Sequence, residues 1–190
     1  MLRARDIPNL ISVLRILLVL PVIWLLLHQH YQAAMALFFV AGLSDGLDGF
    51  LARFFHWQSR LGGILDPLAD KFLLVSVYLC LGWLGALPWW LVGLVLLRDL
   101  VIVSGAVAYH LRVARLEASP TWVSKFNTLM QILLALLVVY SLGFEALPAG
   151  LLEGMILAVA ITTTLSGIDY VVRWSRKARA ARTNINDDRS

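Results

Sequence analysis

The chain has 190 residues, of which 60% are hydrophobic and 15% are charged, and its mean hydropathy is +0.80. This composition is too apolar for a soluble domain and indicates an integral membrane protein. The net charge of +4 would suggest a nucleic-acid partner in a soluble protein. Here the basic residues lie at the ends of apolar segments, so we assign them to membrane topology and anionic headgroups and expect no nucleic-acid binding.

Six apolar segments predict an all-α, polytopic membrane protein with six transmembrane helices. Each segment is long enough to cross about 30 Å of hydrocarbon. We expect one membrane domain over residues 1–175 and a basic, partly disordered cytoplasmic tail over residues 176–190. The predicted spans are residues 9–28, 32–55, 60–83, 87–110, 120–143 and 148–174.

The distribution of Lys and Arg predicts the orientation of these spans. The connections at residues 28–32, 82–87 and 143–147 contain no Lys or Arg, so the basic residues gather at the opposite ends of the spans. By the positive-inside rule, both termini are therefore cytoplasmic. A compact chain without a transit peptide suggests a bacterial inner membrane. The basic ends carry Arg3, Arg5, Arg53, Arg60, Arg112, Arg115, Lys125, Arg173 and several residues that follow Arg173.

Four aspartates interrupt the second and third spans near their cytoplasmic ends. Asp45 and Asp48 are three residues apart, and Asp66 and Asp70 are four apart, so on helices each pair shares one face. Both pairs lie about 10–15 Å below the cytoplasmic surface at 1.5 Å of rise per residue. Two helices that run in opposite directions thus bring the four carboxylates to one depth, which predicts a single site.

The chemistry of this site follows from the cost of burying like charges together. Neighbouring carboxylates repel one another and each loses hydration, so they must be protonated or must bind cations. Only Arg15, Lys71 and Arg98 lie deep in the spans, too few to neutralise four aspartates. A ligand set made only of oxygen atoms suits Mg²⁺ or Mn²⁺.

Several other polar residues have two interpretations each. Arg53 would hold a phosphate or extend to the membrane interface. Arg98 and Asp99 would form a local pair, or Arg98 would face a phosphate or headgroup, and we favour the functional role. Lys125, beside Ser124, would be a boundary lysine or a substrate anchor.

Three further features concern helix packing and helix ends. Gln131 is either a hydrogen-bonding residue between helices or a pocket residue. Asp169 and Arg173 are four residues apart and predict an ion pair on one helix. Ser119, which precedes Pro120, is the expected N-cap of the fifth span.

Residues 45–70 read Asp-x2-Asp-Gly-x2-Ala-Arg-x8-Gly-x3-Asp-x3-Asp. This pattern resembles the signature of the CDP-alcohol phosphatidyltransferases at every defined position. The resemblance implies an enzyme that moves a substituted phosphate from a CDP-linked donor to an alcohol and releases CMP. It also implies a homodimer in the membrane.

The resemblance assigns roles to the motif residues. Asp45, Asp48 and Asp66, with a share from Asp70, would hold two divalent cations, Mg²⁺ or Mn²⁺. Asp70 would also be the base that takes the proton from the attacking hydroxyl. The residues on the side of the CDP-linked donor would be Gly49, Ala52, Arg53 and Gly62, of which Gly49 and Ala52 leave space for cytidine.

Two further stretches bear on the acceptor. Residues 7–15 resemble the branch of the family that contains the phosphatidylglycerophosphate synthases and the CMP-forming cardiolipin synthases, and residues 120–131 look more like the latter. We therefore expect transfer from CDP-diacylglycerol to phosphatidylglycerol, which gives cardiolipin. Transfer to glycerol 3-phosphate, which gives phosphatidylglycerophosphate, is the alternative. The candidate acceptor or phosphate ligands are Asn9, Arg15, Arg98, Ser124 and Lys125.

A cation-coupled or proton-coupled transporter is the alternative from another class of protein. A transporter predicts acidic or polar residues that continue to the far side of the membrane. The outer halves of the second and third spans contain no carboxylate. The ion path would therefore stop halfway, which favours the enzyme.

Overall fold

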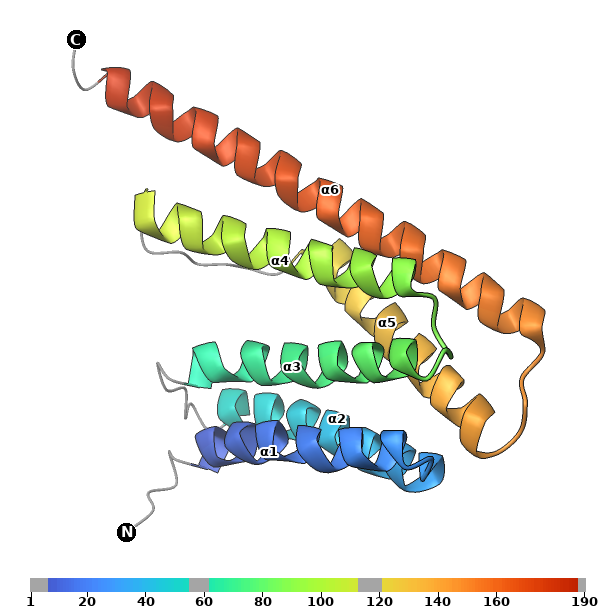
Figure 1. Cartoon of the computed structure of the whole chain (residues 1–190). Coiled ribbons are helices and arrows are strands. Elements are labelled where there is room, and N and C mark those ends of the chain that lie inside the picture. Colours follow the sequence, from blue (N-terminus) through green and yellow to red (C-terminus); the bar gives the residue numbers. More distant parts are fainter. Residues whose placement is uncertain (1–6, 55–61, 113–120, 188–190) are drawn as a thin grey trace. The chain divides into compact units, whose positions relative to one another are not determined.

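The computed structural model describes the backbone of residues 7–54, 62–112 and 121–187, and the side chains of residues 14, 16–42, 71–105 and 121–173. Within these ranges all regular structure is helical, which confirms the predicted all-α class (Figure 1). Helix starts and ends agree with the six predicted segments to within two residues, except at the end of the last helix. The helices are α1 (Ile7–Leu27), α2 (Tyr31–Phe54), α3 (Gly62–Trp83), α4 (Trp89–Arg112), α5 (Trp122–Gly143) and α6 (Ala149–Asp187).

Two stretches in the described part are long and apolar enough to cross a membrane. They are α5 and the segment Ala149–Arg173 of α6. A helix of 25 residues, the length of the second stretch, is about 37 Å long and exceeds a hydrocarbon core of about 30 Å. Shorter apolar stretches occur in three other helices, over Ile16–Leu27, Tyr31–Gly42 and Lys71–Trp83.

The last helix extends well beyond its predicted end at residue 174. The backbone of α6 is helical as far as Asp187, across most of the segment that we expected to be partly disordered. The composition explains the difference, because Ala, Arg and Lys dominate residues 176–182 and are strong helix formers.

The described contacts divide the chain into two compact units. The first unit comprises residues 1–88 and 135–152, and the second comprises residues 89–134 and 153–190. In the first unit, α1 packs against both α2 and α3, and α2 also contacts α3 (Figure 1). Fully buried side chains on these helices include Val22, Leu26, Ala41, Tyr78 and Leu81.

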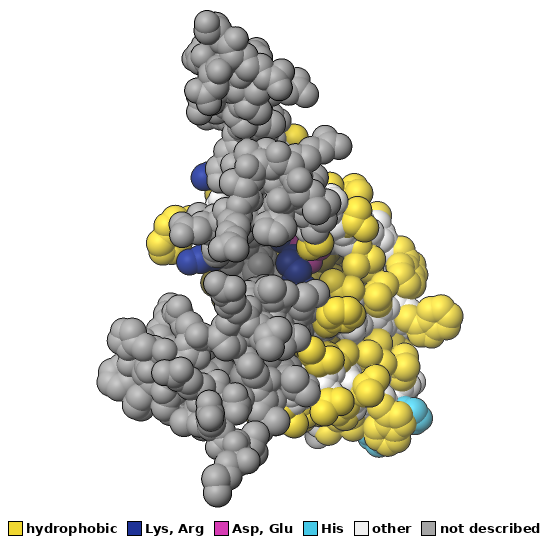
Figure 2. All heavy atoms as spheres, turned by 90° about the vertical axis from the view of Figure 1, so that its left-hand side faces the viewer, with side chains coloured by type: hydrophobic (Ala, Val, Ile, Leu, Met, Phe, Trp, Pro, Cys, Tyr) yellow, Lys and Arg dark blue, Asp and Glu magenta, His cyan; other side chains and the backbone are white. Residues whose placement is uncertain are grey.

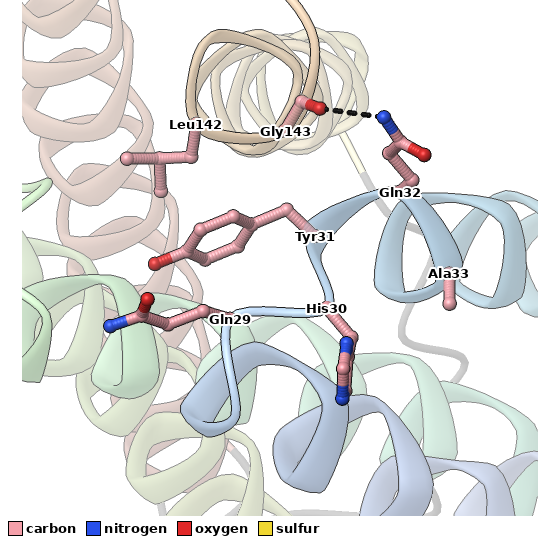
Figure 3. A pocket seen from close by; sticks show the side chains of 7 residues that line it. All are labelled: Gln29, His30, Tyr31, Gln32, Ala33, Leu142 and Gly143. Atoms are coloured by element: carbon pink, nitrogen blue, oxygen red, sulfur yellow. Dashed lines mark hydrogen bonds between the residues drawn. The ribbon is translucent and has the colours of Figure 1, made fainter.

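The connection between α1 and α2 is a short, hydrogen-bonded turn. Gln29 has a φ of 62°, and His30 N–H donates to Leu25 O at 2.9 Å, an arrangement typical of a Schellman helix end. Gln32 Nε2 donates to Gly143 O at 2.9 Å, so this connection is joined to the end of α5 within the first unit. A shallow pocket of about 430 Å³ lies here, as Figure 3 shows, lined by Gln29, His30, Tyr31, Gln32, Ala33, Leu142 and Gly143.

In the second unit, α6 has one polar buried side and one apolar exposed side. Val159, Thr163 and Ser166 are fully buried, at the spacing of one helix face. Small and hydroxyl-bearing residues at a helix contact with an apolar outer surface are typical of membrane bundles. The exposed side carries Leu157, Ile161, Leu165, Ile168 and Val172.

Large apolar side chains are exposed on all six helices in the described part of the chain. Figure 2 shows that hydrophobic side chains cover much of the described surface in that view. Several polar side chains are buried instead, including Arg98, Asn127 and Gln131. A lipid environment accounts for this distribution, because exposed apolar surface of this extent is rare in soluble monomers.

Candidate active site

The motif aspartates lie on two helices of the first unit. Asp45 and Asp48 are in the second half of α2, and Asp66 and Asp70 are in the first half of α3. The first pair precedes the end of α2 by nine and six residues, and the second pair follows the start of α3 by four and eight residues. At about 1.5 Å per residue, both pairs are about 6–14 Å from helix ends that flank one connection.

The helical backbone thus supports the expected sharing of a face within each pair. The aspartate side chains lie outside the described residues, as do the side chains of the donor-side candidates on α2 and α3. Among the side chains that are described, no three His, Cys, Asp or Glu groups are grouped to hold a metal ion. The metal site therefore stays a prediction from the spacing of these residues. The donor-side candidates are Gly49, Ala52 and Arg53 on α2 and Gly62 at the start of α3.

The described polar centre of the second unit surrounds Arg98 of α4. Arg98 is only 5% exposed, and its Nη1 pairs with Asp99 Oδ1 at 2.6 Å. Nη2 donates to Ser124 Oγ of α5 at 2.5 Å and to Ser166 Oγ of α6 at 2.7 Å. Nε also donates to Ser166 Oγ, at 3.2 Å. The predicted local pair is confirmed, and the guanidinium in addition connects three helices.

Two contacts complete the surroundings of this guanidinium. The Tyr170 ring lies beside it, with the ring centroid 5.9 Å from Arg98 Cζ, within cation–π range. Gly167 lies against the Arg98 stem, since a Cβ at this glycine would be 3.8 Å from Arg98 Cγ. The positive charge is therefore buried with one carboxylate, two hydroxyls and one ring, which offsets much of its desolvation cost.

A second polar layer joins α5 to α6 further along. Asn127 Oδ1 accepts hydrogen bonds from Thr162 Oγ1 and Thr163 Oγ1, both at 2.9 Å. Gln131 Nε2 donates to Thr163 Oγ1 at 3.3 Å, so Gln131 forms a helix–helix hydrogen bond, one of its two predicted roles. Asn127 Nδ2 is buried with no hydrogen-bond partner among the described atoms, which leaves both N–H donors of this amide unused in this layer.

The residue that caps the start of α5 is not the one that we predicted. The helix begins at Trp122, and Ser124 N–H donates to Thr121 Oγ1 at 3.2 Å, so Thr121 and not Ser119 is the N-cap. Lys125 is exposed, and its Nζ lies 5.4 Å from the centroid of a Trp122 ring.

The remaining predictions concern an ion pair on α6 and two candidate acceptor ligands on α1. The ion pair of Asp169 with Arg173 is confirmed, with Arg173 Nε 2.8 Å from Asp169 Oδ1. Asn9 and Arg15 lie on α1, but their side chains are outside the described residues. Whether they contact an acceptor stays a prediction.

The α6 side of the polar centre was not predicted from the sequence. Ser166 and Thr163 are fully buried and hydrogen-bonded to Arg98 and Gln131. A signal was present, because Thr162-Thr-Thr-Leu-Ser166 is a run of hydroxyl residues inside an apolar span. Hydroxyl residues inside membrane helices commonly bond to neighbouring helices.

Comparison with known proteins supports the resemblance of the motif. Residues 5–166 match the family model described as CDP-alcohol phosphatidyltransferase. The chain is 34% identical over 180 residues to a probable phosphatidylglycerophosphate synthase of Mycobacterium tuberculosis, an alignment that covers 90% of this chain and 82% of that protein. It is 31% identical over 182 residues to the cardiolipin synthase (CMP-forming) of Rattus norvegicus, covering 86% of this chain and 60% of that protein.

A third relative is a cardiolipin synthase (CMP-forming) / mitochondrial hydrolase fusion protein of Schizosaccharomyces pombe, 33% identical over 183 residues. The alignment covers 87% of this chain but only 30% of the fusion protein, so this chain matches a part of that relative. All three names denote transferases that synthesise phospholipids. Because the family model matches most of the sequence, the chain belongs to the CDP-alcohol phosphatidyltransferase family.

Proposed function

We propose that the protein transfers a phosphatidyl group from CDP-diacylglycerol to a hydroxyl of phosphatidylglycerol, giving cardiolipin and CMP. The observation that carries this proposal is the complete motif over residues 45–70, placed on α2 and α3 at matched distances from their ends. Relatives named cardiolipin synthase support the acceptor. The relative named phosphatidylglycerophosphate synthase favours glycerol 3-phosphate as the second candidate acceptor.

In the proposed site, Asp45, Asp48, Asp66 and Asp70 hold two divalent cations, Mg²⁺ or Mn²⁺. The donor set fits such ions, since each pair of carboxylates is spaced for one helix face and hard cations prefer oxygen ligands. Bound ions would neutralise the pyrophosphate of the donor and the charge that develops on the departing CMP.

The chain's own residues supply the proton transfer and the space for the donor. Asp70 takes the proton of the acceptor hydroxyl. The hydroxyl oxygen forms a bond to the phosphorus of the phosphatidyl group, and the bond from that phosphorus to the bridging oxygen of CMP breaks. CMP leaves as an anion and needs no acid. Small residues at Gly49 and Ala52, with Gly62 and Arg53, border the donor nucleotide in this proposal.

The acceptor side is assigned to Asn9 and Arg15 of α1 and to residues of the second unit. Lys125 is the exposed cation among the latter, and an ammonium group suits a phosphate or a phosphodiester. Arg98 and Ser124 belong to the same proposed side and are hydrogen-bonded to each other.

We also propose how the protein lies in the membrane. Six spans within a single membrane domain over residues 1–175, cytoplasmic termini and a cytoplasmic active site follow from the positions of Lys and Arg. The exposed apolar side chains on all six described helices support contact with lipid. A bacterial inner membrane and a homodimer complete the proposal.

The test is release of CMP by the purified protein with CDP-diacylglycerol and Mg²⁺, with phosphatidylglycerol or glycerol 3-phosphate supplied separately. We expect CMP with phosphatidylglycerol, and loss of activity on chelation that added Mg²⁺ or Mn²⁺ restores. CMP only with glycerol 3-phosphate would select the second acceptor. CMP with neither acceptor would contradict both assignments.

Asp70→Asn tests the proposed base. The variant keeps the size of the side chain but cannot accept the proton, so we expect donor binding to persist while turnover falls by a factor of about 10²–10⁴. Glu153→Gln is the control, because Glu153 is an exposed carboxylate of α6 with no proposed role in turnover. Normal turnover of Asp70→Asn would remove Asp70 from this role.

A further inference from the structure

We infer that Arg98 is a positioning residue, which holds the first turn of α5 and thereby orients Lys125, and that it is not itself a ligand for the acceptor. This inference rests on the proposed function, in which Lys125 is on the acceptor side. It assigns to Arg98 a role different from the direct phosphate contact that its charge alone suggested.

The Arg98 guanidinium already has hydrogen-bonding partners on three helices. Nη1 contacts Asp99, Nη2 contacts both Ser124 and Ser166, and Nε contacts Ser166. Every nitrogen of the group therefore has a partner within the second unit. The side chain is only 4% exposed. A phosphate would have to displace these partners and enter a buried site, at the cost of the ion pair between Arg98 and Asp99.

The partner of Arg98 on α5 is Ser124, which lies in the first turn of that helix. Ser124 is held in three ways: its N–H donates to Thr121 Oγ1, its Oγ accepts from Arg98, and its O accepts from Thr128 Oγ1. Lys125 is the next residue, and its N–H donates to Thr121 O at 3.0 Å. The bond from Arg98, together with the hydrogen bond between Asp169 and Thr121, therefore holds the rotation of this turn, and with it the direction of the Lys125 side chain.

Two other polar side chains of α5 bond to α6 further along the helix. Asn127 and Gln131 bond to Thr162 and Thr163 of α6, one and two turns beyond Ser124. They hold the helix further along and do not touch its first turn. Arg98 supplies a side-chain hydrogen bond from α4 to the first turn of α5. Gln131→Leu is therefore a control that weakens the packing of α5 but leaves the first turn attached.

The substitution Arg98→Lys distinguishes direct binding of a phosphate by Arg98 from positioning of the first turn of α5. A direct phosphate contact needs mainly a positive charge, so Arg98→Lys would keep much of the acceptor affinity. A positioning role needs a planar group that reaches three partners at once, which a single ammonium cannot do. Ser166→Ala provides a milder variant, because it removes the α6 partner of Arg98 and leaves both charges in place.

The experiment measures kcat and the KM of each substrate for wild type, Arg98→Lys, Ser166→Ala and Gln131→Leu in mixed micelles. Hydrogen exchange of the peptide at residues 122–126 is followed in the same samples. We expect the KM for the acceptor to rise on the order of tenfold in Arg98→Lys and less in Ser166→Ala. The KM for CDP-diacylglycerol should be unchanged, with faster exchange at residues 122–126 in both variants. Gln131→Leu should change neither property.

Three results would overturn the inference. They are a KM for the acceptor that Arg98→Lys leaves unchanged, equal increases in KM for both substrates, and exchange at residues 122–126 that matches wild type. Failure of the proposed function appears separately, as a wild type that releases no CMP with either acceptor. In that case the exchange measurement alone still decides whether Arg98 holds the first turn of α5.

Discussion

Gly143, the last residue of α5, is predicted to be a position where even a methyl group is not tolerated. An ideal Cβ there would be 2.7 Å from Tyr31 Cβ, 3.2 Å from Gln32 N and 3.3 Å from Tyr31 C. Non-bonded carbon atoms approach favourably only to about 3.5–4.0 Å, so in Gly143→Ala the two segments must separate by about 1 Å. The neighbouring atoms are backbone or Cβ atoms, which cannot rotate away.

The cost follows from these distances. Overpacking of this kind destabilises a protein by about 1–3 kcal/mol. The same separation lengthens the bond from Gln32 Nε2 to Gly143 O, now 2.9 Å, whose net contribution is at most about 1 kcal/mol. We therefore expect Gly143→Ala to lower the free energy of unfolding by about 2–3 kcal/mol, and the thermal midpoint by about 4–12 °C for a chain of this size.

The measurement is thermal unfolding in detergent, compared with Gly150→Ala. Gly150 belongs to the same unit and has no atom within 4 Å of an added Cβ, so this substitution should leave the midpoint unchanged or slightly raised. If Gly143→Ala unfolds at the same temperature as Gly150→Ala, the close contact between the end of α5 and the α1–α2 connection does not exist in the protein.

Three smaller effects are expected in the same assay. Gln131→Leu removes the buried bond to Thr163 and should cost about 0.5–1.5 kcal/mol; a stabilised variant would show that this bond contributes nothing. Arg173→Gln breaks an exposed pair with Asp169 and should change stability by less than about 0.5 kcal/mol, so a larger loss would contradict this assignment. Gln29→Gly removes a side chain from a residue with φ of 62° and should leave the midpoint equal or higher, whereas clear destabilisation would mean that the Gln29 side chain holds the connection.

The helices could be predicted from the sequence because their signals are local. Long apolar runs between short polar connections predicted all six, and the i,i+4 spacing predicted the pair of Asp169 with Arg173. The exact ends of the helices were harder to predict, because several neighbouring residues can serve as the cap of one helix. Ser119 and Thr121 both carry a hydroxyl that can cap a helix, and only the backbone geometry selects Thr121.

The partners of Arg98 could not be predicted in this way. Asp99 is adjacent in sequence, but Ser124 and Ser166 are 26 and 68 residues away from it. Such pairings depend on how helices rotate and cross, and many serines and threonines in the spans would satisfy the same sequence pattern. The sequence indicated that Arg98 needs partners, because a charge inside a membrane span is costly, but not which residues they are.

The bonding of Arg98 also strengthens the argument for cations at the motif. The sequence contains three deep basic residues, Arg15, Lys71 and Arg98, against the four motif aspartates and Asp99. The structure pairs Arg98 with Asp99, so at most two basic side chains remain for four carboxylates. Protonation of the remaining carboxylates would remove their charge but would also remove the base that the proposed reaction requires. Binding of external divalent cations balances the charge and keeps Asp70 able to accept a proton, and this is why turnover is expected to depend on Mg²⁺ or Mn²⁺.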